Sequence, residues 1–129
     1  MKILAEISVG ELYDKITILN IKLKKINDPN KLKNIKIELD ALVEQSYKLI
    51  LKDDETLRKN IKKLQDINEE LWDIENAKRE CEANKEFGEI FIKISRDVHF
   101  KNDIRASIKK EINLLSNSKI TEEKEYSKY

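Results

Sequence analysis

The sequence predicts an all-α protein, a helical bundle of about five helices whose first two form an antiparallel αα-hairpin. Glycine occurs only twice and proline once among 129 residues, while charged and hydrophobic residues each make up 40%. So few turn formers favour long helices with few connections over a many-stranded sheet. Apolar residues also recur at steps of three and four, which is the spacing of one helix face. We expect a single helical domain over residues 1–129.

The first helix is predicted over 8–27. Ser8 and Glu11 have the spacing of a capping box, in which each side chain satisfies a backbone N–H of the first turn. The apolar positions that follow form a heptad seam: Val9, Leu12, Ile16, Leu19, Leu23 and Ile26. Residues 1–7 alternate in polarity before this helix, and we expect them to form a short extended arm that packs on the bundle.

The second helix is predicted over 31–52. Pro29 disfavours helix at Asp28 and suits the start of the next helix. The new helix repeats the heptad spacing: Leu32, Ile35, Leu39, Leu42, Ser46 and Leu49. Two matched seams joined by a short loop predict the antiparallel hairpin.

Three further helices are predicted over 55–83, 86–98 and 103–115, followed by a charged tail over 116–129. Asp53 or Asp54 is expected to cap the first of these. Asn102 or Asp103 is expected to cap the last, because short polar side chains favour helix starts. Ile104 is expected to point into the bundle.

Composition narrows the classes of function. The net charge is +1, and acidic residues interleave with many of the lysines, so the lysine-rich stretch from Lys22 to Lys36 fits a solvated helix face better than a nucleic-acid surface. Cys81 is the single cysteine, which fits a reducing compartment. No apolar run is long enough to span a membrane. A cytoplasmic location is expected.

The arginines are the residues that most need an explanation. The chain has four arginines and 22 lysines, so each arginine is expected to occupy a position that requires its planar, forked guanidinium group. Glu75, Arg79 and Glu82 share one helix face, near Trp72. The more common explanation of these residues is structural: the charged side chains form salt bridges on the surface, and Trp72 lies in the core. The functional alternative is a polar cluster between the third and last helices that holds an anionic ligand on Arg79, Arg96 and Arg105.

An enzyme is the less favoured interpretation, and no cofactor or metal site is predicted. The single histidine, His99, cannot build a histidine-rich metal site. Carboxylate pairs at helical spacing could bind Mg²⁺, but their order along the chain is not that of all-α nucleotide pyrophosphohydrolases. The first helix has no arginine to hold a dicarboxylate, as a helical chorismate mutase would need.

Four segments carry a resemblance that spans nearly the whole chain. They are SVGELYDKITIL from Ser8, NEELWDIE from Asn68, NDIRASIKKEIN from Asn102 and EEKEY from Glu122. Together they resemble an uncharacterised family of small helical proteins of bacteria and their phages. The resemblance brings no established activity. It marks as pattern positions Glu11, Asp14, Lys15, Trp72, Glu75, Arg79, Glu82, Arg96, Asn102, Asp103, Arg105 and Lys109.

These observations predict a protein that works by association, most simply as a homodimer, because a few helices with wide apolar faces can leave a stripe for a partner to cover. The alternative is a binder or enzyme for a small phosphorylated or carboxylated metabolite. Its site would comprise Trp72, Glu75, Arg79, Glu82, Arg96, Asn102, Asp103, Arg105 and Lys109, with Glu11, Asp14 and Lys15 as contributors. Weak nucleic-acid binding ranks third.

Overall fold

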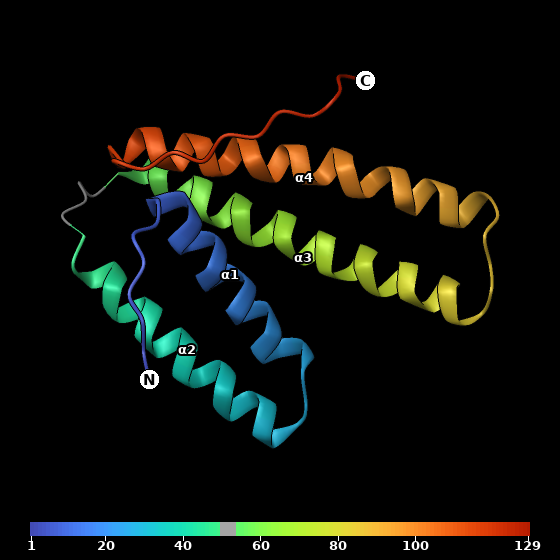
Figure 1. The fold of residues 1–129 in the computed structure, drawn as a ribbon, viewed down its shortest axis with the longest axis horizontal. Coiled ribbons are helices and arrows are strands. Elements are labelled where there is room, and N and C mark those ends of the chain that lie inside the picture. The colour runs from blue at the N-terminus through green and yellow to red at the C-terminus, as the bar shows by residue number, and fades with distance from the viewer. Residues whose placement is uncertain (50–53) are drawn as a thin grey trace.

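The computed structural model describes residues 1–49 and 54–129 and contains four helices, with no strand in those two ranges. They are α1 (Val9–Lys25), α2 (Pro29–Tyr47), α3 (Glu55–Ala83) and α4 (Glu89–Leu115), drawn in Figure 1. The all-α prediction is confirmed. The prediction of five helices is wrong, because the two expected over 86–98 and 103–115 are one continuous helix.

The continuity of α4 has a physical reason. Nothing between Val98 and Ile104 forbids helix, since this stretch holds no proline or glycine. Asn102 and Asp103 do not cap a helix start there. The Asn102 oxygen accepts a hydrogen bond from Arg105, and Asp103 pairs with the C-terminal tail. Their side chains therefore do not compete for the helix backbone. Ile104, expected to point inward, is 46% exposed.

α1 and α3 begin beside predicted caps, whereas α2 begins at Pro29, two residues before its predicted start. The Ser8 Oγ accepts from the Glu11 N–H at 3.0 Å, and Asp28 accepts from the first N–H groups of α2, which starts at Pro29. Asp54 caps α3 in the same way. α1 ends at Lys25, two residues before the predicted end. α2 ends at Tyr47, and residues 50–52 of its predicted span lie outside the described residues.

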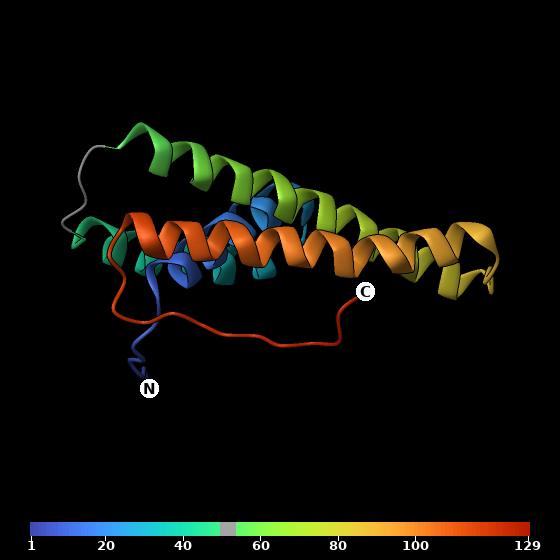
Figure 2. The same cartoon turned by 90° about the horizontal axis from the view of Figure 1, so that it is seen from above.

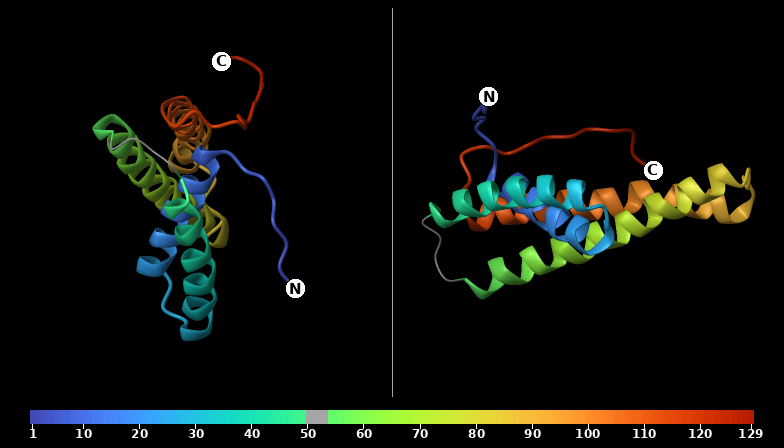
Figure 3. Two further views of the ribbon diagram at one scale, coloured as in Figure 1. Left: turned by 90° about the vertical axis from the view of Figure 1, so that its left-hand side faces the viewer. Right: turned by 90° about the horizontal axis from the view of Figure 1, so that it is seen from below.

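The arrangement is a three-helix body with a fourth helix on its outside. α3 and α4 form a long antiparallel hairpin, and α1 packs against both, as Figures 1 and 3 show. α1 and α2 run antiparallel, as predicted, and among the described residues α2 packs against α1 alone. The core cluster lies between α3 and α4 with α1 over it, and its buried members are Leu57, Leu64, Ile67 and Ile112.

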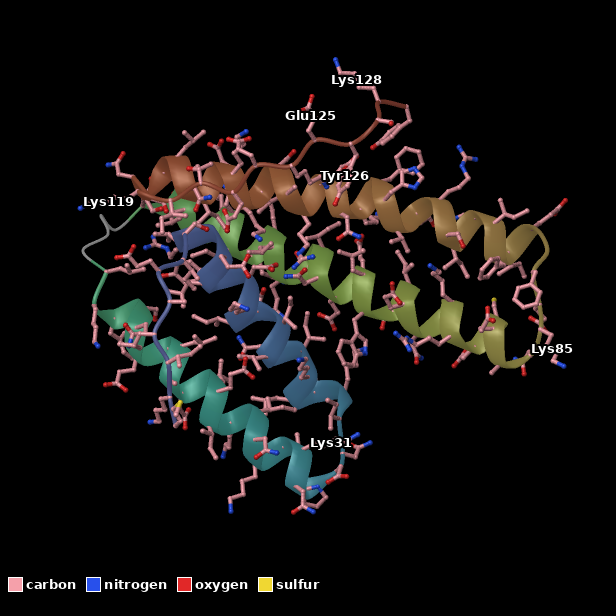
Figure 4. All side chains as sticks on the ribbon, viewed as in Figure 1. Lys31, Lys85, Lys119, Glu125, Tyr126 and Lys128 are labelled. Carbon is pink, nitrogen blue, oxygen red and sulfur yellow. The ribbon has the colours of Figure 1, made fainter. Side chains whose placement is uncertain are left out.

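The α3–α4 hairpin extends well beyond the end of α1 (Figures 1 and 3). The last turn of α1 lies beside Asp73, whose carboxylate is 3.4 Å from the Lys25 ammonium. Beyond that point residues 74–100 form a two-helix projection, here called the distal arm. Cys81 is its one buried residue, all of this range being described. In Figure 4, Lys85 marks the tip of the distal arm and Lys31 marks the separate tip of the α1–α2 hairpin.

The two ends of the chain behave differently. The arm over residues 1–7 does not pack as predicted, because Ile3 and Leu4 are 85% and 95% exposed. The C-terminal segment, by contrast, turns after α4 and runs back along it, as Figure 2 shows. The tail therefore covers part of α4.

Candidate functional site

A buried carboxylate lies at the point where α1, α3 and α4 meet. Asp14 of α1 is 1% exposed. The Arg105 guanidinium of α4 grips both of its oxygens, with Nε donating to Oδ1 at 2.9 Å and Nη2 donating to Oδ2. The Asn68 amide of α3 donates to Oδ1 at 2.9 Å. One side chain from each helix thus converges on a single ion pair.

Further polar groups complete this cluster. The Asn68 Nδ2 also donates to the Thr17 Oγ1 at 2.9 Å, and that hydroxyl donates to the Asp14 carbonyl. The Lys109 ammonium lies 2.5 Å from the Glu11 carboxylate and 3.8 Å from that of Asp14. We call the set the polar junction; it consists of Glu11, Asp14, Thr17, Asn68, Asn102, Arg105 and Lys109.

The polar junction is electrostatically balanced. Burial would raise the pKa of Asp14, but hydrogen bonds from Arg105 and Asn68 and the charges of Arg105 and Lys109 outweigh it, so the pKa is lowered. The hydrogen bond to Asp14 in turn raises the pKa of Arg105. Asp14 is therefore ionised at neutral pH and held by partners, which suits a fixed helix junction better than a proton acceptor.

Local sequence explains how these groups reach one another. Asp14 and Thr17 are three residues apart on α1, and Arg105 and Lys109 are four apart on α4, so each pair shares a helix face. Asn68 stands next to the core residue Ile67 on α3. The junction therefore lies along the edge of the apolar core.

The first turn of α1 docks on α4 beside the junction. The Gly10 N–H donates to the Asn113 Oδ1 at 2.7 Å, and the Val9 N–H donates to the Ser118 Oγ at 3.1 Å. A Cβ on Gly10 would lie 2.6 Å from the Lys109 carbonyl oxygen. Only glycine permits this approach without displacement of the helices.

The tail closes over the same region. The Ser8 hydroxyl donates to the Glu122 carboxylate at 2.5 Å, and the Asn113 amide donates to its other oxygen at 3.3 Å. Burial opposes ionisation of Glu122, but the Ser8 hydrogen bond and further contacts leave its pKa lowered. The tail thus fastens the start of α1 to the end of α4.

A groove of about 640 Å³ lies between α4 and this tail. Its cationic lining residues are Arg105, Lys109, Lys110 and Lys124, and His99 and Tyr126 also line it. Asp103 accepts from the Tyr129 hydroxyl and lies 2.9 Å from the Lys124 ammonium. Figure 4 shows Glu125 and Lys128 pointing away from α4, toward solvent.

The structure brings some of the predicted site residues together and not others. Glu11, Asp14, Asn102, Arg105 and Lys109 meet in the polar junction. Lys15 lies at its edge, 3.6 Å from Glu11. Asp103 faces the tail instead.

The remaining predicted residues lie elsewhere on α3 and α4. Arg79 is on the distal arm with its side chain 82% exposed, 3.9 Å from Glu75. Glu82 and Arg96 are exposed on the same arm, and Trp72 is half-buried near its base. The Arg96 guanidinium lies 5.9 Å from the centre of the Phe100 ring. The three C-terminal arginines therefore do not share one cluster.

Sequence reasoning missed several members of the site. Thr17, Asn68 and Asn113 are buried polar residues inside helices, and Glu122 lies in the tail; all four stand in segments that carry the family resemblance, but none was a predicted site residue. A signal did exist for Gly10, one of two glycines in the chain and placed inside a predicted helix. Asparagine beside an apolar seam was a weaker signal of the same kind.

Residues 1–49 and 54–129 contain neither a metal-binding cluster nor a membrane-spanning helix. No three His, Cys, Asp or Glu side chains gather there in a way that could hold a metal ion. None of the helices in those ranges is both long enough and apolar enough to cross a bilayer.

Comparison with known proteins gives one match. A family described as a family of unknown function, DUF6165, matches residues 1–129. No curated protein and no solved structure matches the chain.

Proposed function

The chain belongs to this DUF6165 family, and we propose that it is a helical association module that works as a homodimer. The single observation that carries the proposal is the amount of surface left uncovered. The chain exposes 9853 Å². A compact folded monomer of 15.2 kDa is expected to expose about 7,100 Å², so the excess is about 2,700 Å².

That excess is large compared with what a partner needs. A standard protein interface covers about 800 Å² on each partner. The extended ends of the chain contribute to the excess, and so do helices with few neighbours, such as α2, which packs only against α1 among the described helices. Large apolar side chains lie on this surface: Ile37, Tyr47, Phe87, Ile90 and Ile92 are all exposed. A second copy is the simplest partner that covers such a surface.

Sedimentation velocity over a range of about 1 to 100 µM tests the proposal, a range in which a micromolar dissociation constant becomes visible. We expect the mass to rise with concentration toward twice 15.2 kDa. A mass that stays at 15.2 kDa through the whole range would contradict self-association.

A second candidate function is the binding of a small anion in the groove between α4 and the tail. Four cationic side chains line that groove, and phosphate or carboxylate groups pair well with such a set. Each of those cations already lies near a carboxylate, so a ligand must displace contacts such as the one at 3.5 Å between Lys110 and Glu123. This makes the anion site the weaker of the two proposals.

Thermal unfolding with inorganic phosphate or citrate tests the second candidate against chloride at equal ionic strength. A ligand that binds the folded state raises the melting temperature. We expect the rise in the unmodified chain and in Lys59→Ala, whose side chain is exposed on α3, and a smaller rise in Lys110→Ala. Equal melting temperatures in all three anions would remove this candidate.

A further inference from the structure

The distal arm differs from the body of the molecule in how much of it is buried. In the body, Leu57, Leu64 and Ile112 are almost fully covered because α1 lies over the α3–α4 hairpin. In the distal arm the corresponding layer is absent. Cys81 is buried there, whereas Phe87, Ile90 and Ile92 are 51%, 70% and 55% exposed. Two helices alone cannot enclose a core, so this end of the hairpin leaves apolar side chains uncovered.

The arm also carries exposed arginines. Arg79 and Arg96, two of the four arginines in the chain, lie on it with exposed side chains. Arginine is enriched where proteins meet, because its planar fork pairs with carboxylates while its stem packs on apolar groups. Glu75 and Glu82 are exposed on the same arm, so two copies of the arm offer both partners of such a pair.

Net charge favours the distal arm over the other projecting hairpin for self-association. The tip formed by residues 22–36 holds six lysines and one aspartate, a net charge of +5, and would repel a copy of itself. Residues 74–100 hold six acidic and five basic side chains, a net charge of −1. Two arms can therefore approach without strong repulsion.

We infer that the distal arm, residues 74–100, is the surface that binds a second copy of the chain, arm against arm, with both hairpins joined into one four-helix bundle. The inference rests on the proposed homodimer and names its interface. The arm has apolar surface for such a partner, since Phe87, Ile90 and Ile92 are 51%, 70% and 55% exposed. The second copy supplies the helices that the arm lacks.

Two matched substitutions on α4 test the interface by sedimentation velocity. Ile90 on the arm and Leu114 at the far end of the helix are 70% and 69% exposed, so glutamate at either site should leave the fold intact. We expect Ile90→Glu to raise the dimer dissociation constant about tenfold or more, and Leu114→Glu to change it less than about twofold. Circular dichroism verifies that both variants keep their helix content.

The outcomes separate the interface from the proposed function. If the unmodified chain is monomeric, the proposed homodimer itself is wrong. A dimer that tolerates Ile90→Glu, or that is broken equally by Leu114→Glu, survives as a dimer but overturns the arm as its interface. Hydrogen exchange gives a second readout: amides of residues 74–83 and 89–100 should exchange more slowly at high protein concentration, and protection confined to α2 would also overturn the inference.

Discussion

Gly10 is the residue at which α1 comes closest to α4. In a helix, glycine costs about 1 kcal/mol relative to alanine, so its presence inside α1 needs a compensating reason. The reason is the Lys109 carbonyl oxygen, 2.6 Å from where a Cβ would stand, together with the Asn113 Oδ1 at 2.9 Å. Backbone and a hydrogen-bonded side chain both block the space, so an added methyl must push the helices apart.

Gly10→Ala is therefore expected to destabilise the protein by about 1–3 kcal/mol, despite the better helix propensity of alanine. Gly88→Ala is the control, because a Cβ at Gly88 would have no atom within 4 Å apart from those of Gly88 and its two chain neighbours. Urea unfolding followed by circular dichroism measures both. A Gly10→Ala variant at least as stable as the parent would show that the close approach does not constrain the junction.

Asp14 governs the response of the junction to pH. Its pKa is lowered in the folded chain, so its contribution to stability is present above the pKa of an unfolded aspartate, about 3.9, and is lost as pH falls through the lower folded value. Asp14→Asn leaves Arg105 without its carboxylate partner and is expected to cost about 3 kcal/mol at pH 7. The gap between this variant and the parent should narrow below about pH 4.

Asp103→Asn is a matched control for that experiment, because Asp103 pairs with Lys124 and Tyr129 at the surface rather than in the interior. Its effect at pH 7 should be much smaller than that of Asp14→Asn. Thermal melts at pH 7, 5 and 3 supply the comparison. A stability gap for Asp14→Asn that is the same at all three values would contradict an ionised Asp14 in the junction.

At the scale of elements, α4 is where sequence and structure differ most. The caps of α1 and α3 could be predicted at Ser8 and Asp54, because a cap acts on N–H groups two or three residues away. Asn102 and Asp103 look like a cap by the same local rule. Asp103 is held by Lys124 and Tyr129, which lie far along the chain, and Asn102 accepts from Arg105, whose guanidinium grips Asp14 of α1.

A single proline substitution in the middle of α4 distinguishes one continuous helix from two separate helices. Proline at position 104 would be well placed as the first residue of a helix capped by Asp103, but inside continuous α4 it removes a hydrogen bond and clashes with the carbonyl of Phe100. Ile104→Pro is expected to cost about 3 kcal/mol or more, and Ile104→Ala far less. Chemical unfolding measures both, and a well-tolerated proline would support the two-helix prediction.

The candidate site could be predicted only in part, for a related reason. The scarcity of arginine correctly pointed to a residue that needs a planar fork, and Arg105 has that environment around Asp14. The same argument placed Arg79 in a cluster, but it is exposed on the distal arm. The scarcity of arginine can indicate that an arginine is needed at a position. It cannot indicate where the partner of that arginine lies, because this depends on which helices pack together.

At the scale of the whole molecule, the four helices do not enclose one another. α2 packs against α1 alone among the described residues, and the distal arm lacks the layer that α1 provides elsewhere. A chain built in this way gains stability when its uncovered surface is covered. Its stability therefore should depend on its own concentration.

The melting temperature is the measurement that addresses this dependence. We expect it to rise as protein concentration increases from about 1 to 100 µM, because association favours the folded state by mass action. The Ile90→Glu variant should show a weaker dependence than Leu114→Glu. A melting temperature that is the same across the range for the unmodified chain would argue against association coupled to folding.

The distance along the chain between Asp14 and Arg105 also bears on how the protein is made. Arg105 follows Asp14 by 91 residues. At roughly 5–20 residues per second, a ribosome takes roughly 5–20 s to deliver the arginine after the aspartate. For that interval α1 and α2 can pair with each other, but the carboxylate that later joins α1 to α4 has no guanidinium to meet. The α1–α2 hairpin is thus complete in sequence well before the residue that ties α1 to α4 is synthesised, so the Asp14–Arg105 attachment can form only late.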